Sequence, residues 1–198
     1  MKISLLKNPH TYSGYFYYIR GAWNAIPDVN TLIDTGTNDF VLSAISDINS
    51  GVGKRKLDLV ILTHEHFDHA GGLKYVVEQY NPEVLAFKKL PYVTTTTKDG
   101  MRVKIGDEMA EIMHTPGHSH DSICIYTLDS KNLFVGDLAY NIKTPGGSYS
   151  KEFVEVLERL CALEINTLYS GHDDPVSENV LELLQLSYQN VIKSKILN

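Results

Sequence analysis

Residues 63–72 read Thr-His-Glu-His-Phe-Asp-His-Ala-Gly-Gly, and this run constrains the fold and the chemistry of the chain more than any other segment. Three histidines and an aspartate stand within six positions, too dense for a chance surface loop: His64, His66, Asp68 and His69. An apolar stretch typical of a buried strand precedes the run, and apolar residues at helical spacing follow it. The four side chains therefore lie on a strand-to-helix connection, where α/β folds place their chemistry.

The bulk composition sets broad limits on the protein. A chain of 198 residues is long enough for one sizeable core, and we predict a single domain over residues 1–198. The net charge of −6 argues against a nucleic-acid partner. No apolar segment is long enough to span a bilayer, and charge interrupts the N-terminus too soon for a signal peptide. Cys124 and Cys161 indicate no disulfide framework. We therefore expect a cytoplasmic protein without a membrane partner.

Strand and helix patterns alternate along the chain. Strand patterns occupy residues 12–19, 30–33, 57–62, 84–87, 101–105, 109–115, 123–128, 132–135 and 167–169. Helical spacing occupies residues 39–48, 73–80, 151–163 and 177–196, with Ser177 as the N-cap of the last helix. This order predicts an α/β fold in which two sheets pack on each other with helices outside.

Three further candidate ligands share one local context. His118, Asp137 and His172 each follow an apolar strand pattern, and a glycine directly precedes each of them. Glycine permits the sharp backbone turn that directs a side chain away from a strand end. We therefore expect these side chains to join the cluster at residues 64–69.

The order His-x-His-x-Asp-His, then a lone histidine, an aspartate and a histidine, resembles the metallo-β-lactamase superfamily of hydrolases. The resemblance runs from Asp34 to His172 and implies an αββα four-layer sandwich, with two mixed sheets face to face and helices outside. It also implies two metal sites and one bridge between them. The first site would use His64, His66 and His118, the second Asp68, His69 and His172, and the bridge would be Asp137. Asp34 would orient the ligand loop from behind.

The ligand types fit this implication independently. Imidazole and carboxylate groups without thiolate suit zinc, iron or manganese. We expect two divalent ions, with Zn²⁺ as the first choice and iron or manganese as alternatives. With a bridging hydroxide, such a site keeps a formal charge of roughly +1, which attracts a carbonyl oxygen. The sequence thus predicts a metal-dependent hydrolase that cleaves an activated acyl bond of a small molecule, with Asp68 orienting the hydroxide and receiving its proton.

Two branches of the superfamily share further features with the chain. The glyoxalase II branch has similar Thr-Pro-Gly-His-Ser and Gly-Asp segments, which favours a thioester substrate. Residues 173–198 leave room for one long helix only, so we expect a thioester or ester smaller than a glutathione conjugate. The acyl-homoserine lactonase branch has the same Asp-x-x-Tyr spacing as Asp137 and Tyr140, where the phenol donates to the substrate carbonyl. Packing beside the ligand loop is the other role open to Tyr140.

A different reaction class stays open at this stage. His64, His118 and Asp137 also match a two-histidine, one-carboxylate triad on a single iron, which would resemble the persulfide dioxygenase branch. A non-catalytic binding module would show degraded ligand positions, and none of the seven is degraded. The chain is compatible with a monomer or a homodimer.

Overall fold

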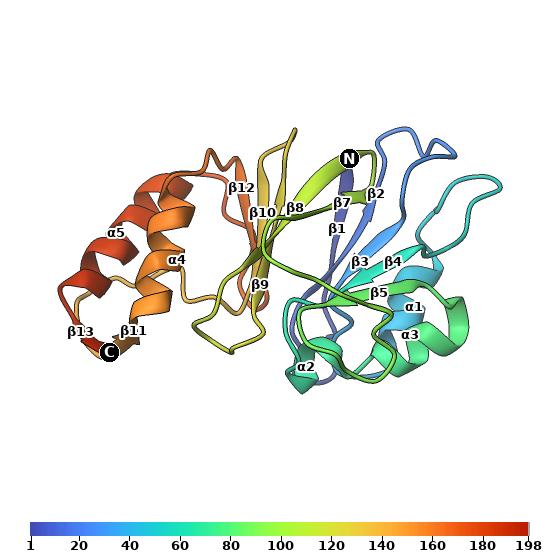
Figure 1. The fold of residues 1–198 in the computed structure, drawn as a ribbon. Helices are drawn as coiled ribbons and strands as arrows, with labels where there is room; N and C mark the ends of the chain where they lie inside the picture. Colours follow the sequence, from blue (N-terminus) through green and yellow to red (C-terminus); the bar gives the residue numbers. More distant parts are fainter. Residues whose placement is uncertain (198) are drawn as a thin grey trace.

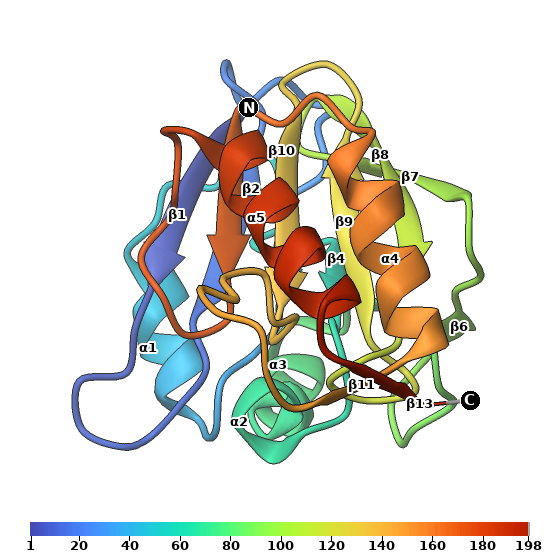
Figure 2. The same ribbon diagram turned by 90° about the vertical axis from the view of Figure 1, so that its left-hand side faces the viewer.

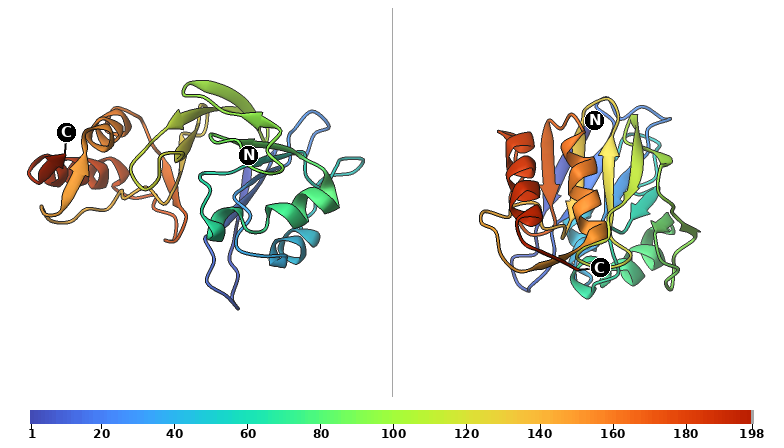
Figure 3. Two further views of the ribbon diagram at one scale, coloured as in Figure 1. Left: turned by 60° about the horizontal axis from the view of Figure 1, so that its bottom comes forward. Right: turned by 60° about the vertical axis from the view of Figure 1, so that its left-hand side comes forward.

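The computed structural model describes residues 1–197. Two sheets lie face to face in the middle of the molecule, and helices cover both outer faces (Figure 1). The left-hand view of Figure 3 places α4 and α5 at one end and α1 and α3 at the other, with the strands between them. The predicted αββα sandwich is therefore confirmed.

The first sheet has six strands and is mixed. Its spatial order is β1 (Lys2–Leu6), β2 (Phe16–Arg20), β3 (Thr31–Ile33), β4 (Leu59–Ile61), β5 (Glu83–Ala86) and β6 (Thr95–Thr96). The first three strands pair antiparallel, and β3 to β6 pair parallel. Parallel neighbours need crossover connections, and these contain α1 (Phe40–Ser46), α2 (Phe67–Ala70) and α3 (Leu73–Tyr80).

The second sheet has five strands and is also mixed. Its spatial order is β12 (Thr167–Ser170), β10 (Asn132–Gly136), β9 (Ile123–Thr127), β8 (Glu108–His114) and β7 (Met101–Ile105). Only β12 and β10 pair parallel. Helices α4 (Lys151–Cys161) and α5 (Val180–Ile192) lie side by side in front of this sheet (Figure 2). Beyond them, β11 (Ser148–Ser150) pairs in parallel with β13 (Lys195–Leu197).

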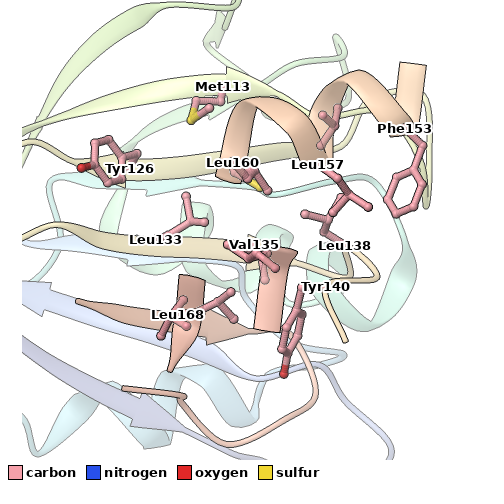
Figure 4. Packing of buried hydrophobic residues seen from close by; sticks show 14 of the residues in the cluster. Met113, Tyr126, Leu133, Val135, Leu138, Tyr140, Phe153, Leu157, Leu160 and Leu168 are labelled. Atoms are coloured by element: carbon pink, nitrogen blue, oxygen red, sulfur yellow. The ribbon is translucent and has the colours of Figure 1, made fainter. Parts of the chain in front are cut away.

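Side-chain alternation along the strands builds separate apolar clusters. Phe16 and Tyr18 of β2 pack with Val41 and Ile45 of α1, whereas Tyr17 and Ile19 belong to the core between the sheets. The third cluster joins β10 and β12 to α4 and α5, and it includes Leu157, Leu160 and Leu168 (Figure 4). Both sheets are thus covered on both faces, which fixes the strand ends that carry the candidate ligands.

The predicted elements correspond to observed ones, but the strand expected from residue 12 begins only at Phe16, and the last helix needs two corrections. The last helix was predicted from Ser177 to residue 196, but it begins after Asn179, which has a left-handed φ of 54°. Asparagine tolerates this conformation better than most residues. The predicted end of this helix at residue 196 was also wrong. Helix α5 ends at Ile192, and Lys195–Leu197 pairs with β11 as a strand. Strands β1, β6 and β11 and the short helix α2 were not predicted. Within the described residues, no helix is long and apolar enough to cross a membrane.

Candidate metal centre

The seven candidate ligands meet at one edge of the two sheets. His64 and His66 follow β4, and Asp68 and His69 lie in the short helix α2 at the lower edge of the molecule (Figure 1). His118, Asp137 and His172 follow β8, β10 and β12. Strands β8, β10 and β12 run in the same direction, because β9 pairs antiparallel with its two neighbours. Their carboxyl ends therefore bring His118, Asp137 and His172 to one edge, where they meet the residues that follow β4 of the other sheet.

The nitrogen and oxygen atoms form two groups. His64, His66 and His118 form one, and Asp68, His69, Asp137 and His172 form the other, each with its atoms within 4.8 Å of one another. In the first group, Nδ1 of His66 lies 2.8 Å from Nε2 of His118. In the second, Nε2 of His172 lies 3.1 Å from Asp68 Oδ2 and 3.4 Å from Nε2 of His69. Such compact sets of imidazole and carboxylate groups could each hold a divalent cation.

Asp137 contacts both groups. Its Oδ2 atom lies 3.4 Å from Nε2 of His118 and 3.3 Å from Nε2 of His172. Its Oδ1 atom lies 3.0 Å from Nε2 of His69, yet it is buried and makes no hydrogen bond to the described residues. The carboxylate is therefore the common neighbour of the two groups.

Asp34 orients two of the histidines from behind. Its Oδ2 atom lies 2.8 Å from Nδ1 of His69 and accepts a hydrogen bond of 2.8 Å from the Thr63 hydroxyl. That hydroxyl in turn lies 3.0 Å from Nδ1 of His64. Because each Nδ1 has an acceptor, both Nδ1 atoms carry a proton and both Nε2 atoms point toward Asp137 in the cluster. Nε2 of His64 is buried without a hydrogen-bond partner.

The ionisation of the cluster reflects burial and its carboxylates. Burial lowers the pKa of His64 to about 4, so this imidazole is neutral at pH 7. Burial alone would lower the pKa of His69 too, but the charges of Asp34 and Asp137 raise it to about 10. Burial opposes ionisation of Asp137, yet the proximity and charge of His69 and His172 hold the pKa of its carboxyl well below the ordinary value. The site therefore favours a positive charge at its centre.

Tyr140 lies between the cluster and the apolar interior. Its ring is 5 % exposed and packs with the cluster of α4 and α5 (Figure 4). Its hydroxyl donates to Asp173 Oδ2 at 3.1 Å. Burial and the Asp173 charge raise the pKa of the phenol to about 12. Tyr140 lines a cavity of about 290 Å³ together with His118, Asp137 and His172. Both roles considered for this residue are thus compatible with its position.

Other histidines stay outside the cluster, and two neighbours were not predicted. His114 stacks on Phe87, with ring centroids 3.9 Å apart, and contacts the carbonyl of His120. Thr63 links Asp34 to His64, and its position directly before His64 was the only sequence signal for this role. Tyr12 stacks on His172 at 5.5 Å from a loop distant in sequence, and no sequence pattern indicated that contact.

Residues 12–172 match the family described as the metallo-beta-lactamase superfamily. The chain belongs to this superfamily. At modest identity, the sequence is similar to several hydroxyacylglutathione hydrolases. The Pelagibacter ubique protein is 28 % identical over 124 residues, covering 59 % of this chain and 52 % of its own length. The probable hydroxyacylglutathione hydrolase glo2 of Schizosaccharomyces pombe is 35 % identical over 117 residues, covering 57 % and 44 %. The chain thus spans about half the length of these two relatives.

A third relative matches over more of its length. The hydroxyacylglutathione hydrolase of Prochlorococcus marinus is 30 % identical over 176 residues, covering 84 % of this chain and 69 % of its own. Among solved structures, an archaeal metallo-beta-lactamase superfamily protein from Sulfolobus tokodaii superposes with a TM-score of 0.69 at 21 % identity, covering 94 % of this chain and 85 % of that one. ETHE1 from Myxococcus xanthus gives 0.69 at 20 % identity, covering 97 % and 88 %. The structural neighbours support the fold, and membership in the superfamily implies binding of divalent metal.

Proposed function

We propose that this chain is a metal-dependent hydrolase that cleaves an activated acyl bond, a thioester or a lactone, in a small molecule. The observation that carries the proposal is the position of Asp137, whose carboxylate contacts His118 on one side and His69 and His172 on the other. A carboxylate between two groups of imidazoles suits a pair of cations better than a single one. The similarity to hydroxyacylglutathione hydrolases supports hydrolysis as the reaction class.

Buried polar atoms without hydrogen-bond partners make these residues suitable ligands for a pair of metal ions. Nε2 of His64 and Oδ1 of Asp137 are buried without hydrogen bonds, and an unsatisfied buried polar atom is costly unless a cation occupies it. The proton on Nδ1 of His69 is held by Asp34, so Nε2 is the atom that would give up its proton and bind the ion. His64, His66 and His118 would hold one ion, and Asp68, His69 and His172 the other, with Asp137 between them. We propose zinc, with iron or manganese as alternatives.

The chain supplies the groups that complete the chemistry. Divalent ions held here would supply Lewis acidity and lower the pKa of water to about 7. Asp68 would orient the attacking water and accept its proton at a carboxylate oxygen. Its side chain is 17 % exposed, so it is not closed off from solvent. Tyr140 would donate its phenolic proton in a hydrogen bond to the substrate carbonyl oxygen as negative charge develops there.

Elemental analysis of the purified protein, followed by assays with a small panel of thioesters and lactones, tests the proposal. We expect two metal ions per chain and turnover of at least one activated ester. Asp137→Ala should keep the fold, by circular dichroism, and lose turnover. Asp174→Ala is the matched control, since Asp174 is an exposed carboxylate that pairs with Lys7. Unchanged turnover in Asp137→Ala would count against the bridging role.

Elemental analysis and the assays also distinguish the hydrolase from the dioxygenase alternative. One iron per chain, with oxygen consumption and no ester turnover, would favour the dioxygenase reaction that the sequence left open, and it would contradict the hydrolase proposal. Two metal ions with thioester or lactone turnover would contradict the dioxygenase. The number of metal ions per chain and the product formed together distinguish the two reactions. The ligand residues cannot distinguish them, because both reactions would use the same set.

A further inference from the structure

The three most exposed large apolar side chains of residues 1–197 lie on two neighbouring loops. Val52 is 97 % exposed, Trp23 92 % and Ile26 85 %. Trp23 and Ile26 belong to the loop between β2 and β3, and Val52 to the loop between α1 and β4. Single exposed apolar residues are ordinary. Their concentration on two adjacent loops marks an interaction surface.

Hydrogen bonds hold these two loops to each other. Lys54 Nζ donates to the carbonyls of Ala25 at 2.9 Å and Asp28 at 2.8 Å. Asn30 Nδ2 donates back to the carbonyls of Ser50 at 3.0 Å and Arg55 at 2.8 Å. Both loops project at the upper right of Figure 1. Trp23, Ile26 and Val52 therefore stand on one supported surface, which we name the two-loop patch.

Positive side chains surround the two-loop patch without carboxylate partners. Four cationic side chains donate to backbone carbonyls of the two loops: Arg20, Lys54, Lys56 and Lys104. Arg55 donates to carbonyls at the end of α3, and none of the five forms an ion pair within the described residues. Most nearby carboxylates have other partners. Asp28 accepts from an amide of its own loop, Asp58 accepts from the Asn30 amide of the neighbouring loop, and Asp107 pairs with the N-terminal ammonium group at 3.0 Å. The exposed Asp47 is the carboxylate whose charge acts on Lys56. The patch is thus bordered by cations, of which Arg55 is exposed and the others half-buried, in a chain whose net charge is −6.

We propose that the two-loop patch docks on a lipid surface that carries anionic headgroups. Tryptophan favours the membrane–water interface, and aliphatic tips add buried apolar area. Lysine and arginine beside them gain attraction from anionic lipid. A second copy of the chain fits less well, because a symmetric contact would bring the same cations together. A protein partner would need hollows that match three protruding tips, whereas a bilayer deforms around them.

This docking is separate from the proposed chemistry. The two loops lead into the amino ends of β3 and β4, while Asp34 and His64 follow the carboxyl ends of the same strands. A chain docked by the patch would hold its metal centre toward the water. The sequence predicted no membrane partner because no segment could span a bilayer, but a surface contact needs no span.

Trp23 provides a direct test, since it is the single tryptophan of the chain. The full chain is mixed with vesicles of phosphatidylcholine alone, or of phosphatidylcholine with about one-third phosphatidylserine. We expect a blue shift of tryptophan emission and co-sedimentation with the anionic vesicles only. Both should reverse when salt is raised from about 0.05 M to about 0.5 M, because screening removes the electrostatic attraction.

Paired variants identify the surface. Ile26→Ser with Val52→Ser keeps the fluorescent probe and should weaken partitioning by at least about tenfold. Leu186→Ser on α5 is the matched control, because Leu186 is 45 % exposed and distant in the fold, and it should bind as the unaltered chain does. Absence of any shift, equal binding to neutral vesicles, or an equal loss in the control overturns the proposal. A shift that follows protein concentration without lipid assigns the patch to self-association and also overturns it.

Discussion

Gly171 lies against the carboxylate of Asp137, so that a β-carbon at position 171 would stand 2.4 Å from Oδ1 of Asp137. The same carbon would stand 2.6 Å from Cε1 of His69. Only glycine allows the chain after β12 to pass this close to two proposed ligands. The glycine before His172 thus has a packing role in addition to the turn that the sequence indicated.

We therefore expect Gly171→Ala to displace Asp137 and to lower metal affinity by at least about tenfold. A chelator competition titration measures this affinity. Gly53→Ala is the control, because Gly53 has a φ of 72° and no atom within 4 Å of an added β-carbon. This control substitution should lower the free energy of unfolding by about 1 kcal/mol and leave metal affinity unchanged. Wild-type affinity in Gly171→Ala would show that the carboxylate can move without consequence.

Asp34→Asn tests the support behind the histidines. Asp34 receives three donors, from the Thr63 amide, the Thr63 hydroxyl and His69. An asparagine has one acceptor oxygen and would turn its own N–H groups toward one of these donors. Because asparagine tolerates the φ of 58° at this position, the backbone should persist. We expect metal affinity to fall about 10- to 100-fold. Asp39→Asn, at an exposed carboxylate without a capping hydrogen bond, should change nothing.

Tyr140→Phe distinguishes a catalytic phenol from a packing residue. We expect kcat to fall about 10²- to 10³-fold if the phenol donates to the developing oxyanion. Because its pKa is raised to about 12, the phenol keeps its proton below that pH. The ratio of wild-type to variant kcat should therefore stay constant from about pH 6 to about pH 10. Tyr126→Phe, which removes a half-buried hydrogen bond of 2.7 Å to the backbone carbonyl of Glu164, should lower stability without changing kcat. An unchanged kcat in Tyr140→Phe would leave packing as its role.

The sequence predicted the seven clustered side chains because each signal is local. His118, Asp137 and His172 all stand just beyond an apolar strand and beside a glycine, and strands that run the same way end at the same edge. The sandwich followed from the resemblance and from the alternation of strand and helix patterns. The register of its strands is set by buried side chains that alternate between the two faces of a sheet, such as those of β2.

The features that sequence reasoning missed depend on contacts between distant segments. Residues 195 and 196 were predicted as the end of a helix, but residues 195–197 pair with residues 148–150 as a strand. Tyr12 reaches His172 because its loop folds over the site, a relation between residues far apart in the chain. The start of α5 at Val180 depends on the left-handed conformation of Asn179, whereas Ser177 has the stronger capping preference in sequence.

Ser150→Ala tests the N-cap of helix α4. The Ser150 hydroxyl accepts a hydrogen bond of 3.2 Å from the Phe153 amide at the first turn of α4. Loss of such a cap costs about 1 kcal/mol, which should lower Tm by about 2 to 4 °C in a chain of this size. Thermal denaturation followed by circular dichroism measures the change. Ser148→Ala is the control, since Ser148 is exposed and its hydroxyl makes no hydrogen bond within residues 1–197. Equal Tm values for the two variants would mean that α4 is held by the packing of Phe153 and Leu157 alone.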